Sequence, residues 1–220
     1  MKFAVIVFPG SNCDYDAYYV IKHQLELEVD FVWHQNSDLS EYDCIIIPGG
    51  FSYGDYLRAG AIARFSKIME SIKSEANKGK AIIGICNGFQ ILVESGLLPG
   101  ALITNQSTRF ISRTITLKVF NNTSLFTSHY TDNEIIYMPI AHKQGNYIAT
   151  KDTIKKLESE DRILFKYHID NPNGSVYNIG GIINKERNVL GMMPHPERAC
   201  EQILGSDDGK KIFESIIGKC

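Results

Sequence analysis

Five residues in the first half of the chain have the composition of a nucleophile turn. Gly84-Ile85-Cys86-Asn87-Gly88 contains the end of an apolar run, residues 81–85, and begins a stretch with helical character. A nucleophile between a buried strand and a helix, with glycine on either side, is typical of a nucleophile elbow, here with Cys in the place of Ser. A helix N-terminus beside the sulfur favours the thiolate. The alternative is a small buried apolar residue, and the pentapeptide alone leaves both interpretations open.

A second motif near the C-terminus places a base close to a carboxylate. In Met193-Pro194-His195-Pro196-Glu197, each proline favours an extended conformation in the residue before it. Side chains two residues apart on an extended chain point the same way, which predicts that His195 and Glu197 lie side by side. A carboxylate there fixes the tautomer of the imidazole and stabilises its charged form. A surface loop with an incidental ion pair is the alternative, but together with Cys86 the motif predicts a Cys-His-Glu triad.

The glycines of Pro48-Gly49-Gly50-Phe51 follow another short apolar run and leave backbone N–H groups accessible. With the N–H of Asn87, these backbone N–H groups are predicted to form an oxyanion hole, which stabilises the negative oxygen of a tetrahedral intermediate. An ordinary turn is the alternative interpretation of these glycines.

The elements that must position these residues alternate between strands and helices. Apolar runs predict strands, and amphipathic stretches between them predict helices; the strands are residues 3–8, 29–33, 44–47 and 81–85, and the helices are residues 14–27, 57–77 and 87–95. Such alternation predicts an α/β fold: an open, mostly parallel sheet with helices on both faces and right-handed crossovers.

The second half of the chain has a different texture. Short β-rich segments, residues 114–120, 135–140 and 179–183, are interrupted by Asn, Gly and Thr, and we interpret them as antiparallel additions to the sheet. Helices are expected at residues 151–160 and 209–217. Neither a repeat nor a low-complexity linker divides the sequence, so we predict a single domain over residues 1–220.

Composition limits the partners and the compartment. The net charge is −2, and no block of like charges indicates a nucleic-acid or membrane partner. Five scattered cysteines without a CxxC pair are typical of free thiols in a cytoplasmic protein, and the sequence shows no cluster with metal-ligand spacing. The apolar run at the N-terminus is too short for a signal peptide, and no segment has the length of a membrane span.

The three motifs together resemble the class I (triad) glutamine amidotransferases, which have a flavodoxin-like fold. Within that family, strings at residues 8–14, 49–60 and 86–90 are similar to a branch that serves purine biosynthesis, and the resemblance covers residues 3–198. It implies that Cys86 is the nucleophile, His195 the acid and base, and Glu197 the group that orients the imidazole. It also assigns the oxyanion-hole N–H groups to Gly50 and Asn87.

The resemblance extends to the substrate contacts. Gln90 matches a family residue that contacts glutamine, and residues 140–145, which include His142, match the segment whose backbone holds the amino-acid end of the substrate. The chain departs from the family there, because it has Lys143 and Gln144 where Gly and Glu are usual. Arg109 belongs to another family-like stretch, as a carboxylate ligand or as part of a structural salt bridge.

The activity implied by the resemblance is hydrolysis of L-glutamine to glutamate and ammonia, without a metal or cofactor in this chain. Ammonia then passes to a larger synthetase subunit that uses ATP and Mg, and a small accessory subunit is a further expected partner. The sequence contains no P-loop, so the nucleotide site is expected in the partner. Two alternatives remain: a ThiJ-type cysteine hydrolase or stress protein, and a scaffold subunit without activity.

Overall fold

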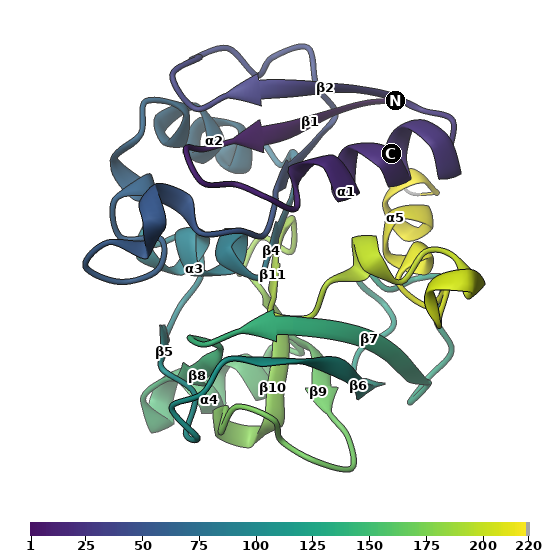
Figure 1. Cartoon of the computed structure of the whole chain (residues 1–220). Coiled ribbons are helices and arrows are strands. Elements are labelled where there is room, and N and C mark those ends of the chain that lie inside the picture. The colour runs from purple at the N-terminus through teal and green to yellow at the C-terminus, as the bar shows by residue number, and fades with distance from the viewer. Residues whose placement is uncertain (219–220) are drawn as a thin grey trace.

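The computed structural model describes residues 1–218, and most strands join one nine-stranded sheet in the order β2-β1-β3-β4-β11-β10-β9-β6-β7 (Figure 1). The first five strands of that order are mutually parallel: β2 (Glu28–Trp33), β1 (Lys2–Val7), β3 (Cys44–Ile47), β4 (Ala81–Ile85) and β11 (Val189–Met192). Every residue of β3, β4 and β11 is buried, as expected for strands covered on both faces. The predicted α/β fold class is confirmed.

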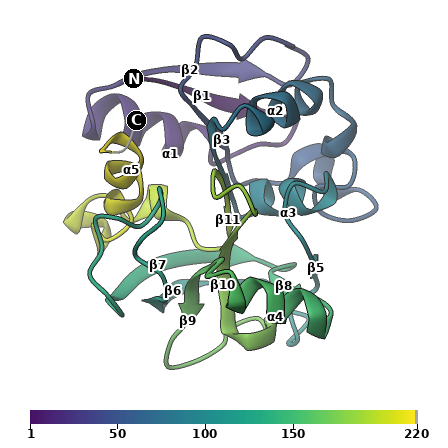
Figure 2. The same ribbon diagram turned by 180° about the vertical axis from the view of Figure 1, so that it is seen from behind.

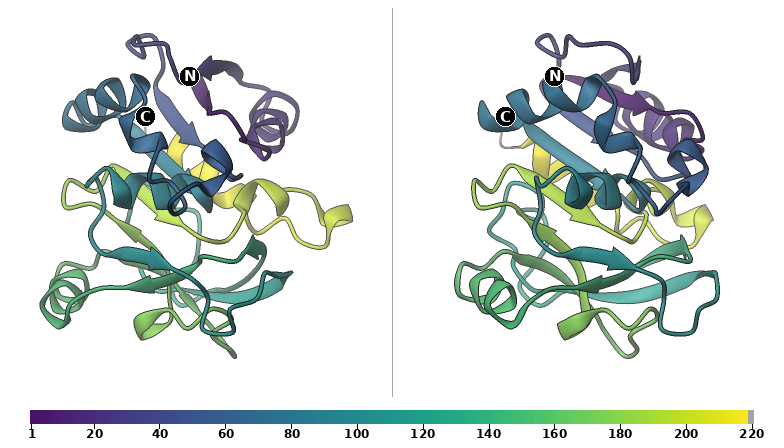
Figure 3. Two further views of the ribbon diagram at one scale, coloured as in Figure 1. Left: turned by 60° about the vertical axis from the view of Figure 1, so that its left-hand side comes forward. Right: turned by 90° about the vertical axis from the view of Figure 1, so that its left-hand side faces the viewer.

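The other four strands extend the same sheet in antiparallel fashion. They are β10 (Ile179–Ile183), β9 (Ile163–Tyr167), β6 (Ile111–Val119) and β7 (Ile135–His142). The sequence patterns predicted β6, β7 and β10 but not β9. They also missed β5 (Ala101–Ile103) and β8 (Asn146–Ile148), which pair with each other as a separate two-stranded sheet. The antiparallel strands form the lower part of the molecule in both views of Figure 3.

Helices cover both faces of the parallel part. Beside β4, α2 (Ile68–Asn77) and α3 (Asn87–Glu94) lie on one side, and α1 (Asp14–Tyr19) and α5 (Lys210–Ile217) lie on the other (Figures 1 and 2). A π-helical turn over Val20–Gln24 extends α1. Together they cover most of the helix predicted at residues 14–27. The predicted helix at residues 151–160 is α4 (Lys151–Ser159), which Thr150 caps through its side chain.

The predicted helix at residues 57–77 is wrong in its first half. Only α2, from Ile68, is regular, and before it lie two 3-10 turns, Ser52–Asp55 and Ala63–Phe65. Leu57 and Gly60 have positive φ (70° and 78°), which an α-helix does not allow. A side chain at Gly60 would collide with the backbone of Gln90 and Ile91, so this segment is irregular because it packs closely on α3.

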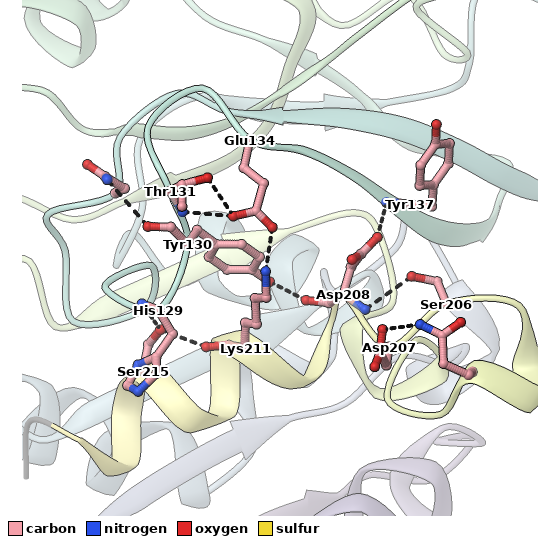
Figure 4. Close-up of polar contacts among 12 residues, drawn as sticks. His129, Tyr130, Thr131, Glu134, Tyr137, Ser206, Asp207, Asp208, Lys211 and Ser215 are labelled. Carbon is pink, nitrogen blue, oxygen red and sulfur yellow. Dashed lines mark hydrogen bonds and ion pairs between the residues drawn. The ribbon is translucent and has the colours of Figure 1, made fainter.

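The C-terminal segment is attached to the loop between β6 and β7 through polar contacts (Figure 4). Lys211 forms an ion pair with Glu134. The carbonyl of Asp208 accepts a hydrogen bond from the Tyr130 hydroxyl (2.6 Å), and its carboxylate accepts one from the Tyr137 N–H (2.7 Å). At the start of α5, the N–H of Gly209 donates to the carbonyl of Ala199 at 2.7 Å. These contacts hold the segment that follows His195 against the edge strand β7 and the loop before it.

Among the described helices, none combines the length and the apolar composition that crossing a bilayer requires.

Candidate active site

Cys86 lies in a strained turn between β4 and α3. Its φ and ψ are 50° and −103°, an unfavourable conformation for a residue with a side chain. The two flanking glycines allow this turn, because a Cβ at Gly84 would collide with Leu92 and one at Gly88 with the carbonyl oxygen of Ile47. The strand, turn and helix predicted around Cys86 are therefore present.

His195 and Glu197 form a buried pair. Nδ1 of His195 lies 2.6 Å from Oε1 of Glu197, and both side chains are almost inaccessible. His195 is extended as predicted (φ −101°, ψ 90°), but Glu197 belongs to the 3-10 turn Pro196–Arg198 and does not continue an extended chain. The predicted contact and the extended backbone of His195 are confirmed, but the extended chain does not reach Glu197, because proline at the first position of the turn favours a helical start. The N–H of His195 also donates to the carbonyl of Pro139 in β7 at 2.9 Å.

Two thiols lie beside the His195 ring. A Cβ placed on Gly49 would lie 2.7 Å from Cε1 of His195, 3.1 Å from Sγ of Cys13 and 3.4 Å from Cβ of Cys86, so only glycine fits between these groups. Burial lowers the pKa of His195, but Glu197 and the two thiols outweigh it, and the net pKa is well above its usual value. Nε2 of His195 makes no hydrogen bond with any described residue. The ring is thus held by Glu197 on one nitrogen and is free on the other.

The sequence patterns placed Cys13 only among the free thiols and did not predict its position beside His195. Sγ of Cys13 donates to Oδ1 of Asn12 (3.1 Å) and accepts a hydrogen bond from Nη2 of Arg198 (3.2 Å). Burial raises the pKa of the Cys13 thiol, although contact with His195 opposes that shift. The signal for this residue was available in the family-like string at residues 8–14.

Ligand atoms of Cys13, His195 and Glu197 lie within 4.8 Å of one another, a grouping that sequence spacing did not reveal. Nδ1 of His195 is already bound to Glu197, and the Arg198 guanidinium next to Cys13 repels a cation. The arrangement therefore fits the orientation of an imidazole better than it fits a metal ion.

Two cavities meet at Cys86. The smaller, about 170 Å³, is lined by Asp55, Gln90 and residues 141–144. The larger, about 280 Å³, is lined by Asn12, Cys13, His195 and Arg198. Cys86 and Gly50 border both cavities, whereas Cys13 borders only the larger one. Of the two thiols beside His195, only that of Cys86 therefore borders both cavities.

The predicted oxyanion-hole donors lie next to this junction. Gly50 has φ 147°, and a side chain there would collide with the backbone of Gly10 and Asn12. Within residues 1–218, neither the N–H of Gly50 nor the N–H of Asn87 donates a hydrogen bond to protein. Both groups are available for a ligand oxygen. Their role stays a prediction.

Gln90 is buried in the wall of the smaller cavity. Its Nε2 donates to the carbonyl of Gln144 at 2.6 Å, and its Oε1 accepts from Nδ2 of Asn87 at 2.8 Å. Because Gln144 contributes its backbone carbonyl here, the departure from the usual family side chain at position 144 leaves this contact intact. Lys143 is exposed and also lines the cavity.

His142 is buried beside the same cavity, and Asn105 fixes its ring. Nδ1 of His142 lies 3.2 Å from Oδ1 of Asn105, which also accepts the N–H of Gly145 at 2.9 Å. Burial, and then the charge of His195, lowers the pKa of His142 to about 4, so the ring is neutral near pH 7. Arg109 is exposed and lines neither of the two cavities at Cys86.

Comparison with known proteins agrees with this geometry. Residues 1–213 match the CobB/CobQ-like glutamine amidotransferase domain. The chain therefore belongs to the glutamine amidotransferase family. A structure of PurLQS from Thermotoga maritima is 45% identical, with a TM-score of 0.90 over 99% of this chain and 97% of that chain.

More distant structures share the fold. Another glutamine amidotransferase from Thermotoga maritima has 14% identity and a TM-score of 0.62, over 100% of this chain and 83% of that one. The glutaminase domain of Trypanosoma brucei CTPS, solved with bound acivicin, has 13% identity and a TM-score of 0.64, over 100% and 95% of the two chains.

Proposed function

We propose that this chain is the glutaminase subunit of phosphoribosylformylglycinamidine synthase, an enzyme of de novo purine biosynthesis. It hydrolyses L-glutamine to glutamate and ammonia within one amidotransferase domain, residues 1–220. The observation that carries the proposal is the position of Cys86, in a strained turn at two cavities and beside the His195–Glu197 pair. The 45% identity to PurLQS over nearly the whole chain, together with the strings at residues 8–14 and 49–60, supports this branch of the family.

The chemistry begins at the Cys86 sulfur. It attacks the carboxamide carbon of glutamine, and the N–H groups of Gly50 and Asn87 stabilise the oxygen that becomes negative. His195 has a raised pKa and therefore carries a proton that it can give to the departing ammonia. The neutral ring then takes a proton from water, which hydrolyses the thioester and releases glutamate. Glu197 holds the ring through Nδ1 and keeps Nε2 directed at the reaction.

Gln90 and His142 border the place where the rest of the substrate lies. Gln90 connects α3 to the backbone of residue 144, so it holds the segment against which glutamine binds. His142, neutral and fixed by Asn105, shapes the wall of the cavity. We assign both residues to substrate binding.

The ammonia released by this reaction must be used at another active site. We propose a larger synthetase subunit that uses ATP and Mg to convert formylglycinamide ribonucleotide to its amidine, with a small accessory subunit in the same complex. No metal or cofactor is assigned to this chain, and the complex is expected in the cytoplasm. Membership of the amidotransferase family disfavours the ThiJ-type alternative.

The test compares two nitrogen sources in the assembled complex. Cys86→Ala should lower glutamine-dependent amidation by at least about 10⁴-fold, because the covalent nucleophile is lost. Activity with added ammonium chloride should stay near the wild-type rate, since the synthetase does not use this thiol. Parallel loss of both activities in a folded complex would refute the assignment of Cys86. A wild-type complex that uses ammonia but not glutamine would support the scaffold alternative.

A further inference from the structure

One acidic side chain, Asp55, lies in the wall of the smaller cavity. Its Oδ1 accepts a hydrogen bond from Nδ2 of Asn87 at 3.1 Å. Among the described residues, no Lys, Arg or His forms an ion pair with it. Burial raises the pKa of Asp55 to about 6, and the bond from Asn87 offsets only part of that shift. A carboxylate in this position is poorly solvated and lacks a counter-charge, so a cationic ligand would stabilise it.

The backbone around Asp55 is built to keep the side chain there. Tyr53, Gly54 and Asp55 all have positive φ, between 52° and 67°, and a non-glycine residue in that region is strained. The N–H of Ser52 donates to Oδ1 of Asn87 at 3.0 Å, so the same amide holds both ends of the turn. Strain of this kind persists only where neighbouring contacts fix the chain. Asp55 is therefore a positioned side chain and not a free surface carboxylate.

The charge of Asp55 is complementary to a charge at one end of the substrate. Cys86 borders the cavity and must receive the carboxamide of glutamine, while the α-carbon of glutamine carries an ammonium and a carboxylate group. Asp55 supplies a negative group in the same cavity, and Lys143 supplies a positive one. The two charges are of the signs that a zwitterionic amino-acid head requires. Gln90, on α3, donates to the carbonyl of Gln144 and carries no charge.

We propose that Asp55 binds the α-ammonium group of L-glutamine and so selects an α-amino acid over a carboxamide that lacks the amino group. This inference rests on the proposed glutaminase function. Asn87 links the two ends of the substrate, because its side chain holds Asp55 and its backbone N–H belongs to the predicted oxyanion hole. A carboxamide that lacks the amino group would leave the half-buried Asp55 carboxylate without a counter-charge, and this is the physical basis of the selection.

The test measures binding in a chain that cannot turn over substrate. In a Cys86→Ala background, dissociation constants are measured by calorimetry for L-glutamine and for glutaramate, which has the same carboxamide and carboxylate but no amino group. Asp55→Asn keeps an oxygen that can accept the bond from Asn87 and removes only the charge. The matched control is Asp132→Asn, in the exposed turn between β6 and β7, where Asp132 accepts a bond from Asn133.

We expect the chain with Asp55 to prefer glutamine over glutaramate by about 10- to 100-fold, as for a partly buried charge pair. Asp55→Asn should reduce that preference to within about threefold, mainly by weakening the binding of glutamine. Asp132→Asn should leave the preference unchanged. An unchanged preference in Asp55→Asn, including the case where both ligands weaken equally, would overturn the proposal and make Asp55 structural. Failure of the glutaminase function shows separately, as absent glutamine-dependent amidation by the complex with Cys86 intact.

Discussion

Cys86 and Cys13 occupy similar places in the chain and differ in what surrounds the sulfur. Each residue immediately precedes a helix, α3 or α1, and each lies beside the ring of His195. Cys86 has a strained backbone (φ 50°) and borders both cavities, whereas Cys13 has a relaxed backbone (φ −103°) and borders one. Arg198 and Asn12 also occupy the hydrogen-bonding capacity of Cys13. We therefore propose that access to the smaller cavity, rather than proximity to a base and to a helix N-terminus, distinguishes the nucleophile.

The largest expected effect concerns the base that the two thiols share. His195→Ala should lower glutamine-dependent amidation by about 10⁴-fold or more, because thiol activation and protonation of ammonia both require the ring. Glu197→Gln should cost less, on the order of 10²-fold, because the orienting group carries no proton in the reaction. Steady-state rates with glutamine, with ammonia-dependent rates as the control, decide the order. A Glu197 variant more impaired than the His195 variant would contradict this division of roles.

The strained turn that distinguishes Cys86 depends on glycine at position 88. Gly88→Ala should destabilise the fold by more than about 3 kcal/mol, because its Cβ would overlap the carbonyl of Ile47. Gly96→Ala is the matched control: it also adds a methyl group near α3 and has positive φ (79°), but no atom lies within 4 Å of the new Cβ. It should cost roughly 1–2 kcal/mol from backbone strain alone. Chemical denaturation of both variants measures the difference, and equal losses would remove the argument for close packing at the elbow.

Of the two thiols, only Cys86 borders the smaller cavity, and the binding of glutamine there should depend on the protonation of Asp55. Since the carboxylate form binds the ammonium group, KM for glutamine should rise as the pH falls through about 6, where Asp55 gains its proton. Cys86, Lys143 and His142 line the same cavity, and His142 stays neutral in this range because its pKa is about 4. The measurement is KM against pH for the wild type and for Asp55→Asn. A variant that keeps the same rise in KM would show that another group titrates.

Cys13→Ala should have the smallest effect and is the sharpest comparison with Cys86→Ala. Burial raises the pKa of the Cys13 thiol, so the sulfur is protonated and a weak nucleophile near pH 7. We expect kcat/KM for glutamine to stay within about fivefold of the wild type. The acidic limb of the pH profile should move slightly, because Cys13 contributes to the raised pKa of His195. Loss of activity comparable to that of Cys86→Ala would transfer the role of nucleophile to Cys13.

Local sequence patterns predicted the elements that a simple repeat of apolar and polar side chains defines. The buried strands β3 and β4 were found from uninterrupted apolar runs, and α4 from its amphipathic pattern. The helix predicted at residues 57–77 failed before Ile68, because the pattern cannot report that Gly60 must fit against the backbone of α3. The strand β9 was missed although its residues 163–167 are mostly apolar; it pairs with β10, the next strand along the chain, and with β6, which lies further away in the sequence.

The sequence by itself determined which residues are candidates for chemistry: a cysteine between two glycines after a buried strand, and a histidine and a glutamate separated by one proline. These features are local, since composition and spacing over a few residues fix the backbone and the functional groups. Only the tertiary structure decided which groups meet. It brought Cys13 and Arg198 to His195, and it turned Asp55 into the cavity beside Cys86. Such contacts depend on sheet order and loop packing, which bring together residues that are separated in the sequence, as far as Cys13 from Arg198, and local spacing does not report them.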